Sequence, residues 1–178
     1  MVTQERRCKN EYCIIPVRLV ISDRQEFLNA IRRTGERYGV SIACLNRTMI
    51  AGFDHVETAL IHAMRAWKEE RMIARSLEIE ILLYAAGTRQ TGQIASFGPE
   101  TGINSLYLCI VPPKSEVIIS LLKGMSEVSD EDWNEVSEEK KKRLMQFYGI
   151  TPDELEVTGQ ERLTDLICER CALLAINR

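Results

Sequence analysis

The stretch that most constrains the fold of this chain is residues 76–90, SLEIEILLYAAGTRQ. It holds a nearly continuous apolar run, residues 79–86, with a single Glu80 set into it. Apolar residues alternate with glutamates at its start, as in a half-buried strand, but Glu, Leu and Ala are good helix formers. Gly87 suits the position after a helix, where glycine adopts the left-handed conformation at little cost. We therefore expect a buried helix that leads into a polar surface segment, residues 88–90.

The length of 178 residues and the ordinary hydrophobic content of 45% predict one globular domain over residues 1–178. A membrane-spanning helix needs about 20 consecutive apolar residues, and the sequence has no such run. Because the polar N-terminal residues lack the apolar centre of a signal peptide, we expect a cytoplasmic protein with no membrane partner. The net charge is −3, so any contact with nucleic acid must come from a local basic patch.

The first part of the chain predicts alternating strands and a helix. An Ile- and Val-rich strand is expected at residues 12–21, with Pro16 indicating an edge strand or a bulge. A helix should follow, with Asp23 as its N-cap, Glu26 completing a capping box, and Gly39 at its end. Two further strands are expected at residues 40–45 and, after a turn, at residues 48–51.

A long second helix is expected from Asp54, where Glu57 follows at the spacing of a capping box, to about Arg75. At about 100° per residue, four cations of this helix share one arc: Arg65, Lys68, Arg71 and Arg75. They form the clearest basic patch of the sequence. The alternative is an ordinary solvated face, because Glu69 and Glu70 adjoin the patch and charged helix faces usually point to water.

The second half of the chain predicts one more strand and several helices. The strand is expected at residues 105–111 and a short apolar segment at 116–122. Residues 124–160 are rich in charge and form a possible helical insertion or appendage, anchored by Trp133, Leu144 and Phe147. A last helix is expected at residues 160–176, with one face formed by Leu163, Leu166, Ile167, Arg170 and Leu174. The predicted fold class is α+β: a small, mainly antiparallel sheet packed by several helices.

No pattern of catalytic or metal-binding residues stands out. The two histidines, His55 and His62, are seven residues apart, which is not the spacing of a helical zinc site. Cys168 and Cys171 have C-x-x-C spacing, but no second pair or histidine lies nearby in sequence. We interpret these cysteines, and Cys8 and Cys13, as core residues. The chain is expected to be a binding module rather than an enzyme, with no cofactor.

Three ordered motifs resemble those of a known family. They are Asp54-His55 followed by Ala59, His62-Ala63 and Arg65-Ala66; then EILLYA at residues 80–85; then Gly87-Thr88-Arg89-Gln90. Together they resemble the small accessory subunit of the KEOPS (EKC) complex, called PRPK-binding protein in animals. The match is good over residues 45–112 and loose at the ends.

The resemblance implies a function and its sites. KEOPS makes the threonylcarbamoyl modification of adenosine 37 in tRNA. The subunit of this family binds the small atypical kinase/ATPase subunit directly and has the transferase subunit only as an indirect partner. It is also similar to proteins that hold the 3′ CCA end of tRNA. The predicted RNA-binding residues are Arg65, Lys68, Arg71, Arg75, Arg89 and Gln90. The predicted kinase-binding residues are Leu166, Ile167, Arg170 and Leu174 of the last helix.

Two alternatives remain open at this stage. The first is a pure protein-interaction subunit that anchors or stimulates the kinase without binding tRNA. The second is a small enzyme or metal protein that uses Cys168, Cys171 and a histidine.

Overall fold

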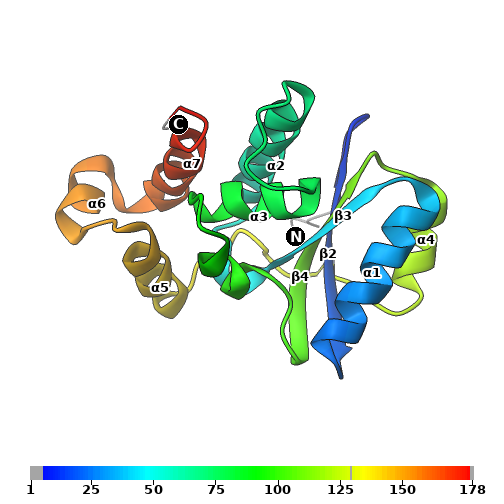
Figure 1. The fold of residues 1–178 in the computed structure, drawn as a ribbon. Coiled ribbons are helices and arrows are strands. Elements are labelled where there is room, and N and C mark those ends of the chain that lie inside the picture. Colours follow the sequence, from blue (N-terminus) through cyan, green and yellow to red (C-terminus); the bar gives the residue numbers. More distant parts are fainter. Residues whose placement is uncertain (1–5, 129, 177–178) are drawn as a thin grey trace. The chain divides into compact units, whose positions relative to one another are not determined.

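A computed structural model describes residues 6–128 and 130–176. Within these residues the chain falls into two compact units. We call residues 1–46 with 98–133 the sheet unit, and residues 47–97 with 134–178 the helical unit. The described residues form seven α-helices and a small antiparallel sheet, which confirms the predicted α+β class (Figure 1). The sequence also predicts a frayed start over residues 1–10, and residues 1–5 of that stretch lie outside the described residues.

The sheet unit is built around two long, fully paired strands. β2 (Cys13–Ile21) pairs with β4 (Gly102–Val111) over the whole of β2, and β4 pairs on its other side with β3 (Ser41–Asn46). The outer edge of β2 carries two short strands, β1 (Arg7–Cys8) and β5 (Ser126–Glu127). All pairs are antiparallel. The strands predicted at residues 12–21, 40–45 and 105–111 are therefore confirmed.

Pro16 lies on that outer edge of β2. Its carbonyl accepts a hydrogen bond from the backbone N–H of Val128, at 3.0 Å, on the β5 side. The nitrogen of a residue in a strand faces the same side as its carbonyl, so the missing N–H of Pro16 falls between the start of β1 and the end of β5 rather than in the ladder with β4. The predicted edge strand is therefore wrong, since β2 is paired on both sides, but Pro16 lies at a break in the pairing where no N–H is required.

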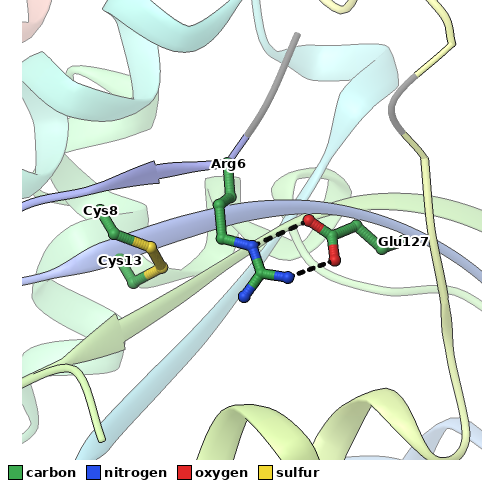
Figure 2. The surroundings of a disulfide bond; sticks show 4 residues. All are labelled: Arg6, Cys8, Cys13 and Glu127. Atoms are coloured by element: carbon green, nitrogen blue, oxygen red, sulfur yellow. Dashed lines mark hydrogen bonds and ion pairs between the residues drawn. A yellow bond between two sulfur atoms is a disulfide. The ribbon is translucent and has the colours of Figure 1, made fainter. Parts of the chain in front are cut away.

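The N-terminal strand is fastened by one covalent and one ionic contact (Figure 2). Cys8 and Cys13 are cross-strand partners and form a disulfide. Arg6 donates two hydrogen bonds to the carboxylate of Glu127, at 3.0 and 2.6 Å. The interpretation of Cys8 and Cys13 as plain core cysteines is thus wrong, because the hairpin of β1 and β2 brings an exposed Cys8 against a buried Cys13.

One face of the sheet is covered by α1 (Arg24–Tyr38) and α4 (Ser115–Leu122). The apolar cluster beneath them takes every second residue of the strands, as period-two alternation requires. Its members are Cys13, Ile15 and Val17 of β2, Ile42 and Cys44 of β3, Leu106, Leu108 and Ile110 of β4, Val40, Ile31 of α1, and Val117 and Leu121 of α4. The predicted start and end of α1 are confirmed: Asp23 accepts from the N–H of Glu26 at 2.8 Å, and Gly39 is left-handed.

The helical unit contains α2 (Phe53–Lys68), α3 (Leu77–Ala86), α5 (Glu138–Tyr148), α6 (Pro152–Thr158) and α7 (Leu163–Leu173). α2 packs against both α3 and α7. The helix predicted for the apolar run is confirmed, because Ser76 caps α3 and Gly87 ends it with φ 61°. α6 begins in the same local way, because the side chain of Thr151 accepts from the N–H of Glu154 at 3.1 Å and Pro152 is in the first turn.

The strand predicted at residues 48–51 is wrong. The chain forms a 3₁₀ turn at Arg47–Met49, with the N–H of Ile50 bonded to the carbonyl of Arg47 at 3.3 Å. The next N–H, that of Ala51, donates to Nδ1 of His55 at 3.1 Å. The N–H of Ala51 thus donates to a histidine side chain of α2 and not to a neighbouring strand. The alternation of residue types in the sequence could not indicate this contact.

The predicted bounds of the second helix are also wrong. α2 starts at Phe53 after Gly52, whose φ is 135°, with no side-chain cap; the N–H of Phe53 donates to Asn134 at 2.9 Å. The helix ends at Lys68, seven residues early, where Glu70 has φ 54°. The buried Glu80 accepts hydrogen bonds from the N–H groups of Ile73 and Ala74, at 2.9 and 2.7 Å. Those N–H groups would otherwise serve a longer helix.

Candidate functional site

A pocket of about 490 Å³ lies in the helical unit where α3 ends. It collects residues from three parts of the unit: the segment after α3, the end of α5, and α7. The lining residues are Ala86, Gly87, Thr88, Arg89, Gln90, Gln93, Phe147, Tyr148, Arg170, Leu173 and Leu174. A pocket of this size suits a small ligand or a single group of a larger one.

Gly87 allows the two sides of the pocket to come together. Its φ of 61° is in the left-handed region, and a Cβ at this position would lie 3.3 Å from the backbone oxygen of Arg170. A side chain here would therefore strain the turn and press on α7 at the same time. The glycine that ends α3 also sets how closely α3 approaches α7.

The carbonyl oxygen of Ala85 in α3, one residue before the first lining residue, joins the helices around the pocket. It accepts hydrogen bonds from Nε2 of His55 in α2 at 2.8 Å, from the hydroxyl of Tyr148 in α5 at 2.5 Å, and from the thiol of Cys171 in α7 at 3.4 Å. Three helices are thus joined to α3 at one atom. Ala85 is fully buried, so these bonds form where water does not compete for them.

The role of His55 is structural. Its Nδ1 accepts the N–H of Ala51, so Nε2 carries the proton that is donated to Ala85. Burial lowers the pKa of His55 to about 4, so the ring is neutral at neutral pH. His62, the second histidine, is half-buried and stacks on the ring of Tyr84 with centroids 5.8 Å apart.

The C-x-x-C pair is part of the same packing. Cys171 is fully buried and burial raises the pKa of its thiol, as expected of a core cysteine. Cys168 is half-buried, and burial also raises the pKa of its thiol. Within residues 6–128 and 130–176, no group of three or more His, Cys, Asp or Glu side chains is placed to hold a metal ion.

The pocket brings together predicted residues of both kinds. Arg89 and Gln90, predicted for RNA, are exposed at its rim, and Gln93 donates to the Gln90 side chain at 2.7 Å. Arg170, predicted for the kinase, lies opposite and donates to Glu154 of α6 at 2.6 Å. The sequence indicated neither that these residues meet nor that Phe147 and Gln93 join them. Phe147 is one of the anchors that the sequence predicts, but no sequence signal singles out Gln93.

The four cations predicted to share one helix face do not do so. Arg65 and Lys68 are on α2, whereas Arg71 and Arg75 lie in the segment after its end. All four are exposed, and Arg71 is 3.6 Å from Glu69. The pocket lining contains none of the four. The segment that carries Arg71 and Arg75 is held against α3 by the buried carboxylate of Glu80.

The residues predicted to bind a partner from α7 are mostly turned inward. Leu166 and Ile167 belong to the helical unit's own core cluster, and Leu174 is buried at the pocket. The exposed apolar residues at this end of the chain are Leu173, 37% exposed, and Ile176, 76% exposed. Any surface that α7 offers to a partner is therefore centred on these two side chains and Arg170.

A comparison with known protein families decides the family. The model of the family described as "Kinase binding protein CGI-121" matches residues 2–175, which is nearly the whole chain. The chain belongs to the CGI-121 family. The predicted resemblance to the KEOPS accessory subunit is thereby confirmed. Across its described residues, this CGI-121 family member has no helix long and apolar enough to cross a membrane.

A relative within the CGI-121 family comes from an archaeon. It is the "Regulatory protein Cgi121" of Methanocaldococcus jannaschii, 23% identical over 141 residues, which are 79% of this chain and 87% of the relative. The family description names kinase binding and the relative's name states regulation.

Proposed function

We propose that this chain is a non-catalytic KEOPS-type subunit that binds the small atypical kinase/ATPase subunit and the 3′ CCA end of tRNA, and so supports threonylcarbamoylation of adenosine 37. The kinase part is supported by the family description over residues 2–175. The tRNA part is supported by the pocket at the end of α3, which is the observation that carries it.

The pocket offers the three kinds of contact that a single-stranded RNA end needs. Arg89 supplies a cation for a phosphate, Gln90 supplies amide groups for a base edge, and Phe147 supplies an aromatic ring. Its volume of about 490 Å³ is that of a site for one small group, not for a duplex.

The exposed cations outside the pocket would act on the phosphates of the same RNA. Arg71 and Arg75 lie in a segment that Glu80 holds in place, so their backbone is positioned before RNA arrives. Arg65 and Lys68 project from α2. Such contacts position the RNA without reading its sequence, and salt weakens them.

For the kinase, we propose the exposed end of α7 as the docking surface. Leu173 and Ile176 provide apolar area, and Arg170 and Leu174 lie at the adjoining pocket. Leu166 and Ile167 would contribute from the core, by fixing the position of α7 rather than by touching the partner.

The tRNA part is tested by titrating the purified chain with one tRNA, with and without its 3′ CCA, at two salt concentrations. We expect binding that requires the CCA and weakens with salt. Arg89→Glu should weaken it at least about tenfold, because a charge-assisted bond becomes a repulsion. The double variant Arg71→Glu with Arg75→Glu should reduce the salt slope. The matched control is Arg32→Glu with Arg33→Glu, two exposed arginines of α1, which should bind as the wild type does.

Two outcomes would contradict the proposed binding of tRNA. Equal affinity with and without the CCA, or an unchanged affinity and salt slope in both test variants, would contradict the tRNA part. The chain would then be a pure protein-interaction subunit.

The kinase part is tested by co-purification with the kinase subunit. Leu173→Asp with Ile176→Asp should abolish a stable complex, because each change places a charge in an apolar contact. Val157→Asp on α6 is the matched control, since Val157 is 89% exposed. If the double variant still forms the complex, this docking surface is wrong. That outcome would not affect the tRNA part of the proposal, which is tested separately.

A further inference from the structure

The first strand of the sheet unit, β1, is a short cover on the outer edge of β2. It has two residues, and its pairs with β2 are Arg7 with Ile14 and Cys8 with Cys13. The turn between the two strands adds one backbone hydrogen bond, at 2.8 Å. Because a two-stranded hairpin is marginally stable by itself, contacts besides the ladder must keep β1 in place.

Two side-chain contacts that keep β1 in place differ in strength (Figure 2). The forked ion pair of Arg6 and Glu127 joins the start of β1 to β5, but the two side chains are 40% and 26% exposed. Water and salt weaken a pair at such positions. The disulfide between Cys8 and Cys13 is covalent and is therefore the stronger of the two contacts.

The effect of this disulfide is confined to the hairpin. Its two cysteines are five residues apart in the sequence. The entropy that a cross-link removes from the unfolded chain grows with the length of the loop that it closes. A cross-link over so short a loop therefore adds little to the stability of the sheet unit as a whole, and its main consequence is the position of β1.

The two cysteines have different surroundings. Cys8 is exposed, so a thiol in solution can attack it while the protein is folded. Cys13 is fully buried in the apolar cluster under α1 and α4. It can remain there after reduction, because a free cysteine packs as a small apolar side chain, as Cys44 does in the same cluster. Reduction thus removes the bond to β1 and leaves the core intact.

We propose that the Cys8–Cys13 disulfide is a redox-operated clasp, and that its reduction by a small thiol of the glutathione class releases β1 from β2. The thiolate of the reductant bonds to Sγ of Cys8 while the S–S bond breaks, and the electron pair of that bond goes to Sγ of Cys13, which takes up a proton. A second molecule of the small thiol then displaces the first. The two leave together as their own disulfide, and Cys8 also becomes a thiol.

Release of β1 changes the outer edge of β2. The carbonyl of Pro16 faces this edge, and the alternation along a strand places the N–H and carbonyl of Ile14 on the same side, towards β1. β5 does not cover Ile14, since it pairs with Val17 and Arg18. The reduced protein therefore has an open edge at Ile14, to which another strand can pair. The clasp is in the sheet unit and the pocket at the end of α3 is in the helical unit, so the clasp does not rest on the proposed function.

The chemistry is tested on the folded full chain, kept either without reductant or with excess reduced glutathione. Free thiols are then alkylated in denaturant and located by mass spectrometry. Cys8 and Cys13 should both be protected without reductant and both be modified after glutathione. Modification in both samples would mean that the disulfide does not form, and protection in both would mean that a small thiol does not open it. Either outcome overturns the clasp.

Hydrogen exchange of the two forms tests the release of β1. The N–H of Ile14 should exchange at least about tenfold faster in the reduced form, whereas the N–H groups of β4 should not change. Cys8→Ser should behave as the reduced form in both samples. The matched control is Cys168→Ser, which removes a half-buried thiol that is not in a disulfide and should respond as the wild type does.

Two results of the exchange measurement would overturn the clasp. Equal exchange of the Ile14 N–H in the oxidised and reduced forms would show that β1 stays in place without the disulfide. Faster exchange throughout β4 after reduction would show that the disulfide stabilises the whole sheet unit rather than the position of β1.

Discussion

The two units of this chain differ in what they bury. The buried polar residues of the sheet unit are uncharged amides, Asn46 and Asn104. The helical unit instead buries a histidine, a glutamate and a lysine: His55, Glu80 and Lys140. Asn104 satisfies itself locally, donating to the carbonyl oxygens of Glu100 and Gly102 and accepting from the N–H of Glu100.

The difference matters because burying an ionisable group ties stability to what surrounds it. Glu80 and His55 are matched to backbone groups, whereas the Nζ of Lys140 has no partner among the described residues. The sheet unit should therefore respond to changes in packing, and the helical unit should respond in addition to the uptake of protons. Hydrogen exchange, which reports each segment separately, can test the comparison.

The largest effect is expected from Leu108→Ala in the sheet unit. Leu108 is fully buried in β4, in register with Ile15 on one side and Cys44 on the other. The cavity should lower the free energy of unfolding by about 4 kcal/mol, and by the same amount at pH 7 and pH 5. Denaturant unfolding measures this loss, and hydrogen exchange of β2 and β4 shows that it lies in the sheet unit. Val20→Ala, at a position that is 72% exposed, is the control. If the loss of stability in Leu108→Ala changed by more than about 1 kcal/mol with pH, the sheet unit would also respond to protons and the expected difference between the two units would be wrong.

Glu80→Ala should cost about 3 kcal/mol in the helical unit, because it leaves the N–H groups of Ile73 and Ala74 without their acceptor. The exchange of these two amides should speed up before the rest of the unit unfolds. Glu78→Ala removes the same group from a half-buried position of α3 and should cost less than about 1 kcal/mol. Similar losses in both variants would mean that the carboxylate of Glu80 does not hold the segment.

Acid should weaken the helical unit through His55. Its pKa is lowered from 6.5 to about 4 by burial, so the unfolded chain takes up a proton first. The stability that comes from keeping the ring neutral is present above pH 6.5 and is lost as the pH falls towards 4. The expected loss is about 2 kcal/mol between pH 7 and pH 5, seen as faster exchange in α2 and α3 than in β2 and β4.

His55→Asn sharpens this test. The variant should be less stable than the wild type at pH 7, since it loses the bond to Ala85, but its stability should depend less on pH. A helical unit whose stability fell with pH as steeply in the variant as in the wild type would assign the acid response to other groups.

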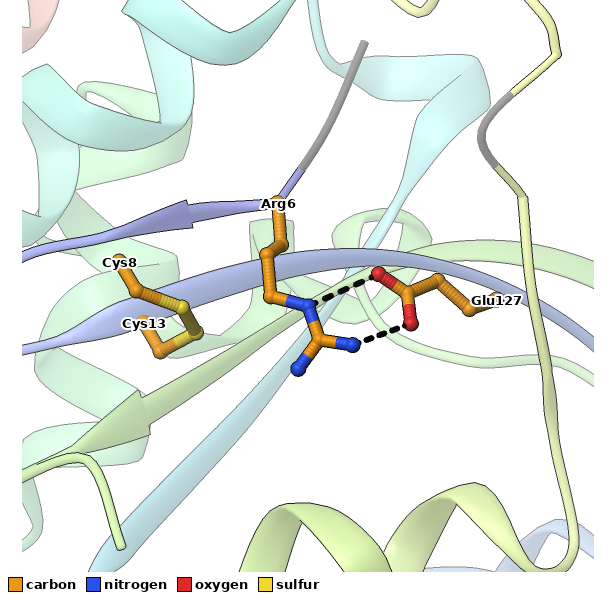
Figure 3. Close-up of polar contacts among 4 residues, drawn as sticks. All are labelled: Arg6, Cys8, Cys13 and Glu127. Carbon is orange, nitrogen blue, oxygen red and sulfur yellow. Dashed lines mark hydrogen bonds and ion pairs between the residues drawn. A yellow bond between two sulfur atoms is a disulfide. The ribbon is translucent and has the colours of Figure 1, made fainter. Parts of the chain in front are cut away.

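The smallest effect is expected from Arg6→Ala. Arg6 and Glu127 form a forked ion pair in the sheet unit, but their side chains are 40% and 26% exposed (Figure 3). Exposed pairs contribute about 0.5 kcal/mol, and less at high salt. Thermal unfolding of Arg6→Ala at low and high salt measures the contribution of this ion pair to stability, and Glu127→Ala is the reciprocal variant. A loss above about 2 kcal/mol would show that a charge matters in the sheet unit as well.

Features that depend on a few neighbouring residues could be predicted from the sequence. The caps at Asp23 and Thr151 and the left-handed Gly87 are local, so residue type at fixed spacing is sufficient. The same holds for the long strands, whose alternation continues over several residues. The fold class and the presence of a surface segment at residues 88–90 could be inferred in this way.

The packing of distant segments decided the remainder. α2 stops at Lys68 because a carboxylate twelve residues further along binds the N–H groups of the next segment, which removes Arg71 and Arg75 from the predicted helix face. On α7, periodicity identified an apolar face at Leu166 and Ile167 but could not tell a core from a docking surface, because both bury the same residue types.

The pocket exists only because α3, α5 and α7 meet. The hydrogen bonds to the carbonyl of Ala85 and the missing side chain of Gly87 determine how closely these helices approach. In the same way, nothing in the charge-rich run of residues 124–160 distinguishes Lys140 from its neighbours, and only the packing of α5 places that ammonium group away from water.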